Sequence, residues 1–332
     1  MNRDTDRGLA RFPLFIALAG AVAGLALGLA LAVGTAATPA DVFALPALRL
    51  AVDLTGTLVV GSSAIGLLLP AESHSPARST AGRAAAREVR HLGGRLTLAG
   101  SAAWALLALV LLWVQAGIAS GEGLGIGLDR VSDYLDVVAA GRGLLVAAAA
   151  AVLCGVLVAV GERRELPPWM LPAVALLGIT ALPLTGHAAA LEDHGLAVAV
   201  AALHAGAAAV WVGGLAVILL LVAPRRGLAA QVLPRFSRIA AWSLAIVAVS
   251  GLLSALIRID PMPAGLLTTG YGWLVLAKTG VLMLLAAVGW TLRSRVVPSV
   301  ARHQPGSLRR WATIELGLMT LAFGLAAVLA MV

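Results

Sequence analysis

Residues 196–222 read LAVAVAALHAGAAAVWVGGLAVILLLV, a run of 27 residues in which His204 is the one ionisable side chain. At 1.5 Å per residue, a helix of this length extends over roughly 40 Å, whereas the hydrocarbon core of a bilayer is about 30 Å thick. A helix also satisfies its own backbone polar groups, as a membrane span must. The run therefore predicts a transmembrane helix that projects beyond the hydrocarbon core.

Apolar runs of similar length recur along the whole chain. Of its 332 residues, 60% are hydrophobic and 12% are charged, whereas a soluble domain is roughly half apolar and about a quarter charged. We therefore expect an all-α fold, a polytopic membrane bundle of about nine transmembrane helices. The expected spans cover residues 13–33, 48–69, 96–117, 135–160, 169–184, 196–222, 239–257, 273–292 and 311–331.

Basic residues gather in the predicted loops on one side of the membrane. With the N-terminus inside, 19 of the 24 lysine and arginine residues lie in inner segments, which is the pattern that orients membrane proteins. The C-terminus is then expected outside. The first apolar run has no clear cleavage site, so we expect it to be retained as a helix. This distribution accounts for the net charge of +8 and excludes nucleic acid as an expected partner.

Two inner segments divide the chain. Residues 71–95 form the longest predicted linker, and residues 161–169 (GERRELPPW) separate the first four spans from the last five. We expect N-terminal membrane helices at 1–165 and a second membrane domain at 166–332. The single cysteine, Cys154, lies within a predicted span, so neither an intramolecular disulfide nor a CxxC metal motif is expected.

A few ionisable side chains lie in or beside the spans. Such groups are costly inside a membrane, which makes them candidates for function. They are Asp53, Arg142, His187, His204, Lys278 and Glu315. Counted along the predicted helices, all of them except Glu315 belong to the outer half, and Glu315 lies near the inner face.

Metal binding is one explanation of the outer group. His187 lies just beyond the outer end of the fifth span and His204 near the outer end of the sixth, so their imidazoles can share one depth. Imidazole suits copper, zinc or nickel, and the thioether of Met262 would favour Cu(I). His194 and Asp53 are further candidate ligands. The histidine spacings of seven and ten residues match no compact metal motif.

A structural role is an alternative explanation for several of these ionisable residues. Arg142 fits a buried charge network that fixes helix packing, and Asp53 and Lys278 fit either that network or a functional site. His194 follows two acidic residues and suits an interfacial loop.

Two further features also have structural explanations. Glu315 can pair with Arg309 or Arg310 near the inner face. The acidic residues of the outer loops either attract cations or simply accompany the positive-inside arrangement.

Several motifs in the second half of the chain occur in a familiar order, and from about Trp169 onward the sequence resembles the CopD family of bacterial copper resistance membrane proteins. The motifs are GHA at 186, LHAGAAAVWVGGL at 203, FSRIA at 236, VSGLLSALIRI at 249, TTGYGWLVLAKTGVLMLL at 268, and RR-x-x-x-x-E ending at 315. Residues 166–332 are therefore expected to be a CopD-like membrane domain. The first half is similar to the less distinctive N-terminal helices of longer actinobacterial members.

The resemblance implies copper transport across, or delivery at, a bacterial inner membrane. His187 and His204 match histidines of the family pattern, and Lys278 and Glu315 also fall on its motif positions. It implies copper ion as the bound metal, and a separate periplasmic CopC-like carrier or oxidase assembly protein as a partner beside the lipid bilayer. No ATP-binding or ATPase motif is found, and we expect no enzymatic activity.

Three functions follow. The first is a copper permease that takes copper from the outer face through a histidine site. The second is a b-type haem protein that transfers electrons, because histidines on helices can ligate haem. The third is an assembly factor for a cuproprotein or oxidase that binds without transporting.

Overall fold

Each predicted span contains an α-helix in the computed structural model, which describes residues 3–32, 39–70, 80–161, 166–185, 194–258, 265–296 and 307–329. The α-helices are α1 (Arg3–Ala32), α2 (Pro39–Leu68), α3 (Thr80–Ser120), α4 (Leu128–Val137), α5 (Ala139–Gly161), α6 (Met170–Ala181), α7 (His194–Val217), α8 (Arg226–Arg258), α9 (Gly265–Thr268), α10 (Gly270–Thr291) and α12 (Ser307–Leu329). A 3₁₀ turn, η1 (Leu182–Thr185), follows α6, and π-helical turns, η3 (Ile218–Val222) and η4 (Leu292–Val296), extend α7 and α10.

The membrane-spanning character is confirmed. In the described ranges, eight helices are long and apolar enough to cross a bilayer. The fifth predicted span corresponds to α6, an apolar helix of 12 residues that η1 prolongs. The protein is therefore an all-α, multi-pass membrane protein.

Two predicted boundaries are wrong. The linker predicted at 71–95 is helical from Thr80 onward, because α3 runs for 41 residues and its basic first turns continue the apolar span. The fourth predicted span, 135–160, is two helices, since Val138 has an extended backbone that separates α4 from α5. The amphipathic α4 therefore belongs to a loop and not to a span.

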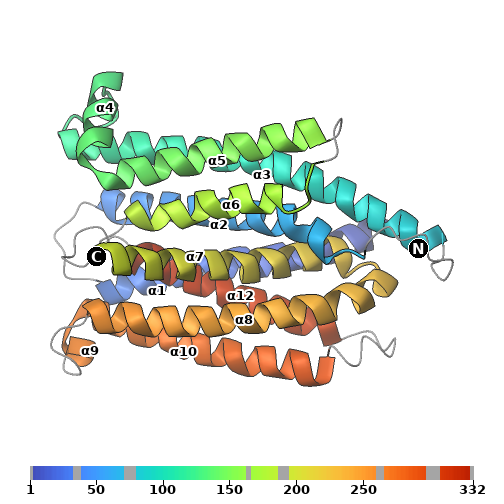
Figure 1. Cartoon of the computed structure of the whole chain (residues 1–332). Helices are drawn as coiled ribbons and strands as arrows, with labels where there is room; N and C mark the ends of the chain where they lie inside the picture. Colours follow the sequence, from blue (N-terminus) through green and yellow to red (C-terminus); the bar gives the residue numbers. More distant parts are fainter. Residues whose placement is uncertain are drawn as a thin grey trace.

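The helices alternate in direction along the bundle (Figure 1). Neighbours in space include α3 with α5, α2 with α7, and α7 with α8, while α1 packs most extensively against α12. Figure 1 shows α4 and α9 at the end of the bundle where the C-terminus lies. The arginine-rich starts of α3, α8 and α12 lie at the opposite end, as the predicted orientation requires.

Glycines bring some helices into backbone contact. A Cβ atom added to Gly61 of α2 would lie 2.1 Å from the carbonyl carbon of Gly213 of α7, and one on Gly213 would lie 2.1 Å from the Thr57 carbonyl oxygen. Gly24 of α1 meets the Leu321 backbone of α12 in the same way. Small residues let transmembrane helices approach this closely, which explains why so apolar a chain contains 37 glycines.

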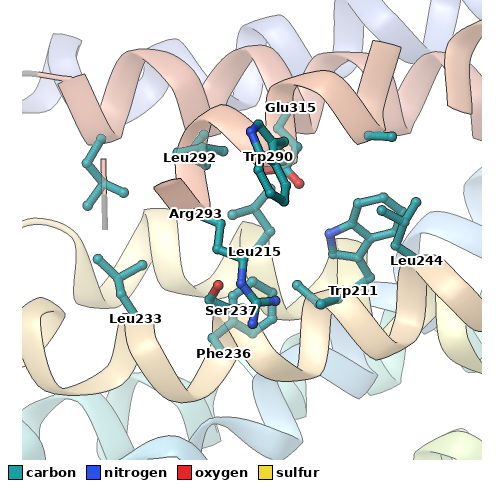
Figure 2. Close-up of a pocket in the computed structure, with 16 residues that line it drawn as sticks. Trp211, Leu215, Leu233, Phe236, Ser237, Leu244, Trp290, Leu292, Arg293 and Glu315 are labelled. Atoms are coloured by element: carbon teal, nitrogen blue, oxygen red, sulfur yellow. The ribbon is translucent and has the colours of Figure 1, made fainter. Parts of the chain in front are cut away.

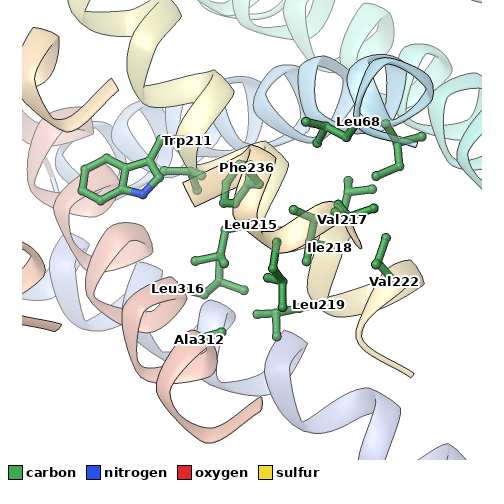
Figure 3. Packing of buried hydrophobic residues seen from close by; sticks show 14 of the residues in the cluster. Leu68, Trp211, Leu215, Val217, Ile218, Leu219, Val222, Phe236, Ala312 and Leu316 are labelled. Atoms are coloured by element: carbon green, nitrogen blue, oxygen red, sulfur yellow. The ribbon is translucent and has the colours of Figure 1, made fainter. Parts of the chain in front are cut away.

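The larger core cluster lies where α7, α8 and α12 meet. Figure 3 shows Trp211, Leu215 and Phe236 beside Leu316 of α12, with the π-helical turn carrying Ile218 and Leu219 deeper into the cluster. This packing places the middle of α7 between the outer and inner halves of the bundle. The polar groups described below lie on either side of it.

Candidate functional site

His204 lies in the outer part of α7 and turns its ring toward α8. Its Nδ1 lies 2.9 Å from the Ser250 Oγ, and a Cβ added to Gly251 would lie 3.6 Å from its Cε1. Ser250 is itself buried. The imidazole is thus held between two helices at one defined position.

Ser250 also determines which nitrogen of His204 is protonated. The serine hydroxyl donates to the Ile246 carbonyl in its own helix, so its oxygen accepts a hydrogen bond from His204 Nδ1–H. A neutral imidazole then carries its lone pair on Nε2, the ring nitrogen that does not contact Ser250. The sequence did not reveal Ser250, because 46 residues separate it from His204 and no local pattern relates the two.

A cation lies in the same half of the bundle. Lys278 is about two turns into α10, which begins at the same end of the bundle as α7 (Figure 1). This agrees with the similar depth that the sequence predicts for Lys278 and His204.

The other predicted ligands are not tested by the geometry. His187 and Met262 lie outside the described residues. His194 begins α7, and its side chain also lies outside them. The predicted pairing of His187 with His204 therefore stays a prediction.

Asp53 is held by Arg49, which precedes it by four residues on α2. Arg49 Nε lies 3.2 Å from Asp53 Oδ1 one turn along α2, and its Nη2 donates to the Leu182 carbonyl at 3.1 Å. The guanidinium is buried and joins α2 to η1. The described contacts give Asp53 a structural partner and do not join it to His204.

The prediction that Arg142 lies in a buried charge network is wrong. Its side chain is exposed and donates to the carbonyls of Leu135 and Asp136, at 3.1 and 3.0 Å. Because those carbonyls end α4, the guanidinium caps that helix from the start of α5.

Acidic residues of the outer loop are partly neutralised by a neighbouring arginine. Arg130 of α4 forms ion pairs with Glu122 at 2.7 Å and with Asp133 at 3.8 Å. The Glu122 carboxylate correspondingly raises the pKa of Arg130. This pairing favours the structural reading of the acidic loop over the cation-gathering one.

Glu315 lines a cavity of about 310 Å³ in the other half of the bundle. Figure 2 shows Glu315 at the level of the Trp290 ring and above Leu215, with Ser237 and the guanidinium of Arg293 lower in the view. The predicted pairing of Glu315 with Arg309 or Arg310 is wrong, because no ion pair joins them in the described structure.

No preformed metal cluster is found in the described ranges, where no three side chains of His, Cys, Asp and Glu gather closely enough to hold an ion. His204 can supply one nitrogen ligand. A complete site would need ligands from segments beyond those ranges or from a partner molecule.

Two family models match the chain. Residues 38–197 match "Copper resistance protein D-like, N-terminal domain", and residues 230–329 match "Copper resistance protein D". A curated relative, the copper transport protein CutJ of Bacillus subtilis (strain 168), is 31% identical over 208 residues, which is 59% of this chain and 38% of CutJ. The chain thus spans about two-fifths of the length of that relative. No solved structure matches the chain.

The first half of the chain has a family model of its own. The expected division between residues 165 and 166 stays a prediction. His187 falls within that N-terminal range, Lys278 and Glu315 fall within the C-terminal range, and His204 lies on α7 between the two.

Proposed function

The chain belongs to the copper resistance protein D family, and from this premise we propose that it is a copper permease of the bacterial inner membrane. Copper is its cargo, taken from the outer face and released inward. The observation that carries the proposal is His204, an imidazole in the outer half of a transmembrane helix whose Nδ1 is engaged by Ser250.

The local chemistry supports a ligand role for His204. Metal-binding histidines typically donate their second ring N–H to a fixed acceptor, which orients the ring and raises the basicity of the ligating nitrogen. Ser250 is such an acceptor. One imidazole is not a complete site, so we propose that His187 completes it, with His194 and Met262 as further candidates.

The direction of entry follows from the predicted orientation. The His204 end of α7 lies at the same end of the bundle as α4, which is the outer end when the arginine-rich ends face inward. A separate CopC-like carrier would then deliver copper at this face. The printed name of CutJ, a copper transport protein, supports the same activity class.

Copper binding and flux test the proposal. Purified protein stripped of metal is titrated with Cu(I) and with Cu(II), and proteoliposomes that contain a copper-sensitive dye report entry. We expect binding and flux in the wild type, and loss of both in a variant that carries His204→Ala and His187→Ala. Leu203→Ala is the matched control, because Leu203 directly precedes His204 on α7 and its side chain is exposed.

Each alternative predicts a different result. Copper binding without flux would contradict transport and favour the assembly factor. A Soret band in the absorption spectrum of the purified protein would favour the haem protein. Unchanged binding in the double histidine variant would show that copper binds elsewhere.

A further inference from the structure

We propose that Glu315 is a proton-binding site in the inner half of the protein, reached from the inner face through the cavity between α7, α8, α10 and α12. The proton comes from water at the inner face, forms an O–H bond with a carboxylate oxygen, and returns to water when that bond breaks. This site is separate from His204.

The first observation is that Glu315 is buried and forms no ion pair with any side chain that the structure describes. Only 5% of its surface is exposed. The indole of Trp211 faces it, but the Trp211 Nε1 is buried and makes no hydrogen bond of ordinary geometry. A lone carboxylate in apolar surroundings is costly, and a bound proton removes that charge.

Among the side chains that the structure describes, no charged group on the neighbouring elements is a fixed counter-ion of Glu315. On η4, Arg293 lines the same cavity but does not form an ion pair with it, and Arg295 does not line it. Arg309 and Arg310 precede Glu315 on α12, and Arg235 and Arg238 lie on α8, yet none of the four lines the cavity.

Among the side chains that the structure describes, the remaining charged or titratable groups on the packed elements lie toward the outer half. They are His204 on α7, Lys278 on α10, and Arg49 and Asp53 on α2. Residues 12–31 of α1, whose side chains the structure describes, contain no charged residue, and η3 contains none.

The cavity provides a route from Glu315 to the inner face. Glu315 lies eight residues into α12, which is about 12 Å along the helix. The cavity continues from there to Leu308 and the exposed Arg293, at the arginine-rich end of the bundle. Figure 2 shows Ser237 and Arg293 bordering this path.

The cavity beside Glu315 can also hold water molecules. A volume of about 310 Å³ holds several water molecules, provided that each has polar partners. The Glu315 carboxyl, the Ser237 hydroxyl and the Arg293 guanidinium belong to lining residues and supply such partners. The remaining lining is apolar and includes Phe236 and Trp290.

Proton exchange at Glu315 would couple copper movement to the proton gradient. The chain contains no ATP-binding motif, so movement against a gradient requires another driving ion. The coupling depends on the proposed transport of copper, whereas the proton site does not.

Carbodiimide labelling tests the proton site on the wild-type protein alone. A hydrophobic carbodiimide reacts with protonated carboxyl groups in apolar surroundings, and peptide mass spectrometry identifies the labelled residue. We expect label on Glu315 that decreases as the pH rises. Asp53 is the matched control, because it is also within a span but is paired with Arg49, and we expect it to stay at background.

The proton site would be overturned by a folded wild-type protein that shows no label on Glu315 at any pH, or equal label on Glu315 and Asp53 throughout. Glu315→Gln should reduce total labelling to background. Because labelling of the wild-type protein alone can refute the proton site, the test does not depend on whether the Glu315→Gln variant folds.

Vesicles with an internal pH dye test the coupling. In wild-type vesicles we expect copper entry to move protons, and in Glu315→Gln we expect copper binding to persist while proton movement falls to background. Unchanged proton movement in the variant would refute coupling through Glu315. Labelled Glu315 with no copper flux in the wild type would instead refute the permease and leave the proton site intact.

Discussion

The hydroxyl of Ser250 determines which ring nitrogen of His204 is available to bind a metal. Its oxygen accepts from Nδ1 while its proton goes to the helix backbone, so the lone pair lies on Nε2. A serine is often found inside transmembrane helices with its hydroxyl bonded to the preceding turn. Here that ordinary arrangement also orients an imidazole.

Replacing Ser250 should weaken copper binding without abolishing it. Loss of a hydrogen-bond acceptor behind a ligating histidine costs about 10–100-fold in metal affinity, and we expect Ser250→Ala to fall in that range. Competition titration with a chelator of known affinity measures it. Ser243→Ala, another buried serine of α8, is the control and should bind as the wild type does; equal losses in both variants would contradict the role of Ser250.

Arg49 should be a structural residue of the outer half. Arg49→Ala leaves Asp53 without its partner and the Leu182 carbonyl without a donor. Breaking a buried pair from one side costs about 3–5 kcal/mol. Thermal unfolding in detergent should show this loss, and the double variant Arg49→Met with Asp53→Leu should recover part of it. A double variant less stable than Arg49→Ala would contradict the argument.

Where two helices are in backbone contact, that contact limits which substitutions either helix tolerates. The α2–α7 contact at Gly61 and Gly213 has no space for a methyl group, because the obstructing atoms belong to a backbone that cannot rotate away. That contact also fixes the position of α7, which carries His204.

An alanine at the α2–α7 contact should separate the helices. Overpacking typically costs about 1–3 kcal/mol, and we expect Gly61→Ala to lie at the upper end. Gly66→Ala is the matched control on the same helix, because a Cβ there meets no atom within 4 Å. Thermal unfolding compares the two, and a tolerated Gly61→Ala would show that the helices are farther apart than described.

The outer helix α4 should depend on Arg142. Arg142→Ala removes the donor to the last carbonyls of α4, so hydrogen exchange of residues 128–137 should become several-fold faster. The unfolding temperature should not change, because α4 contains no buried residue. Amides of α5 beyond its first turn are the internal reference; faster exchange there as well would point to a wider role for Arg142.

Across the whole molecule, the sequence predicts where most helices lie along the chain and that they alternate in direction. Run length and arginine position predicted the helices and their alternation, because a bilayer imposes one thickness on every span. The break at Val138 and the helical start of α3 were not predictable, since hydropathy does not show where a polar helix continues beyond the membrane.

The candidate site was only partly predictable for a related reason. The depth of His204, Lys278 and Glu315 can be counted along each helix, but their neighbours depend on rotation and packing. Ser250 and Trp211 are therefore visible only in the structure. The division near residue 165 stays a prediction, and the packing of α1 against α12 crosses it.

Orientation can be measured directly. In a Cys154→Ala background, we expect Leu128→Cys to react with a membrane-impermeant maleimide added outside intact cells, because Leu128 is exposed on α4. Gly227→Cys, exposed at the opposite end of the bundle, should react only after permeabilisation. The reverse pattern would invert the proposed direction of copper entry.

The side-by-side packing of α1 and α12 bears on biosynthesis. Among the described helices, ribosomes produce α1 first and α12 last, so the glycine-lined face of α1 has no α12 beside it until the others have been made. The two helices can therefore pack against each other only after α12 has been synthesised. Chains interrupted before α12 would display that unfilled face in the bilayer, where membrane proteases and insertases could recognise an unfinished product.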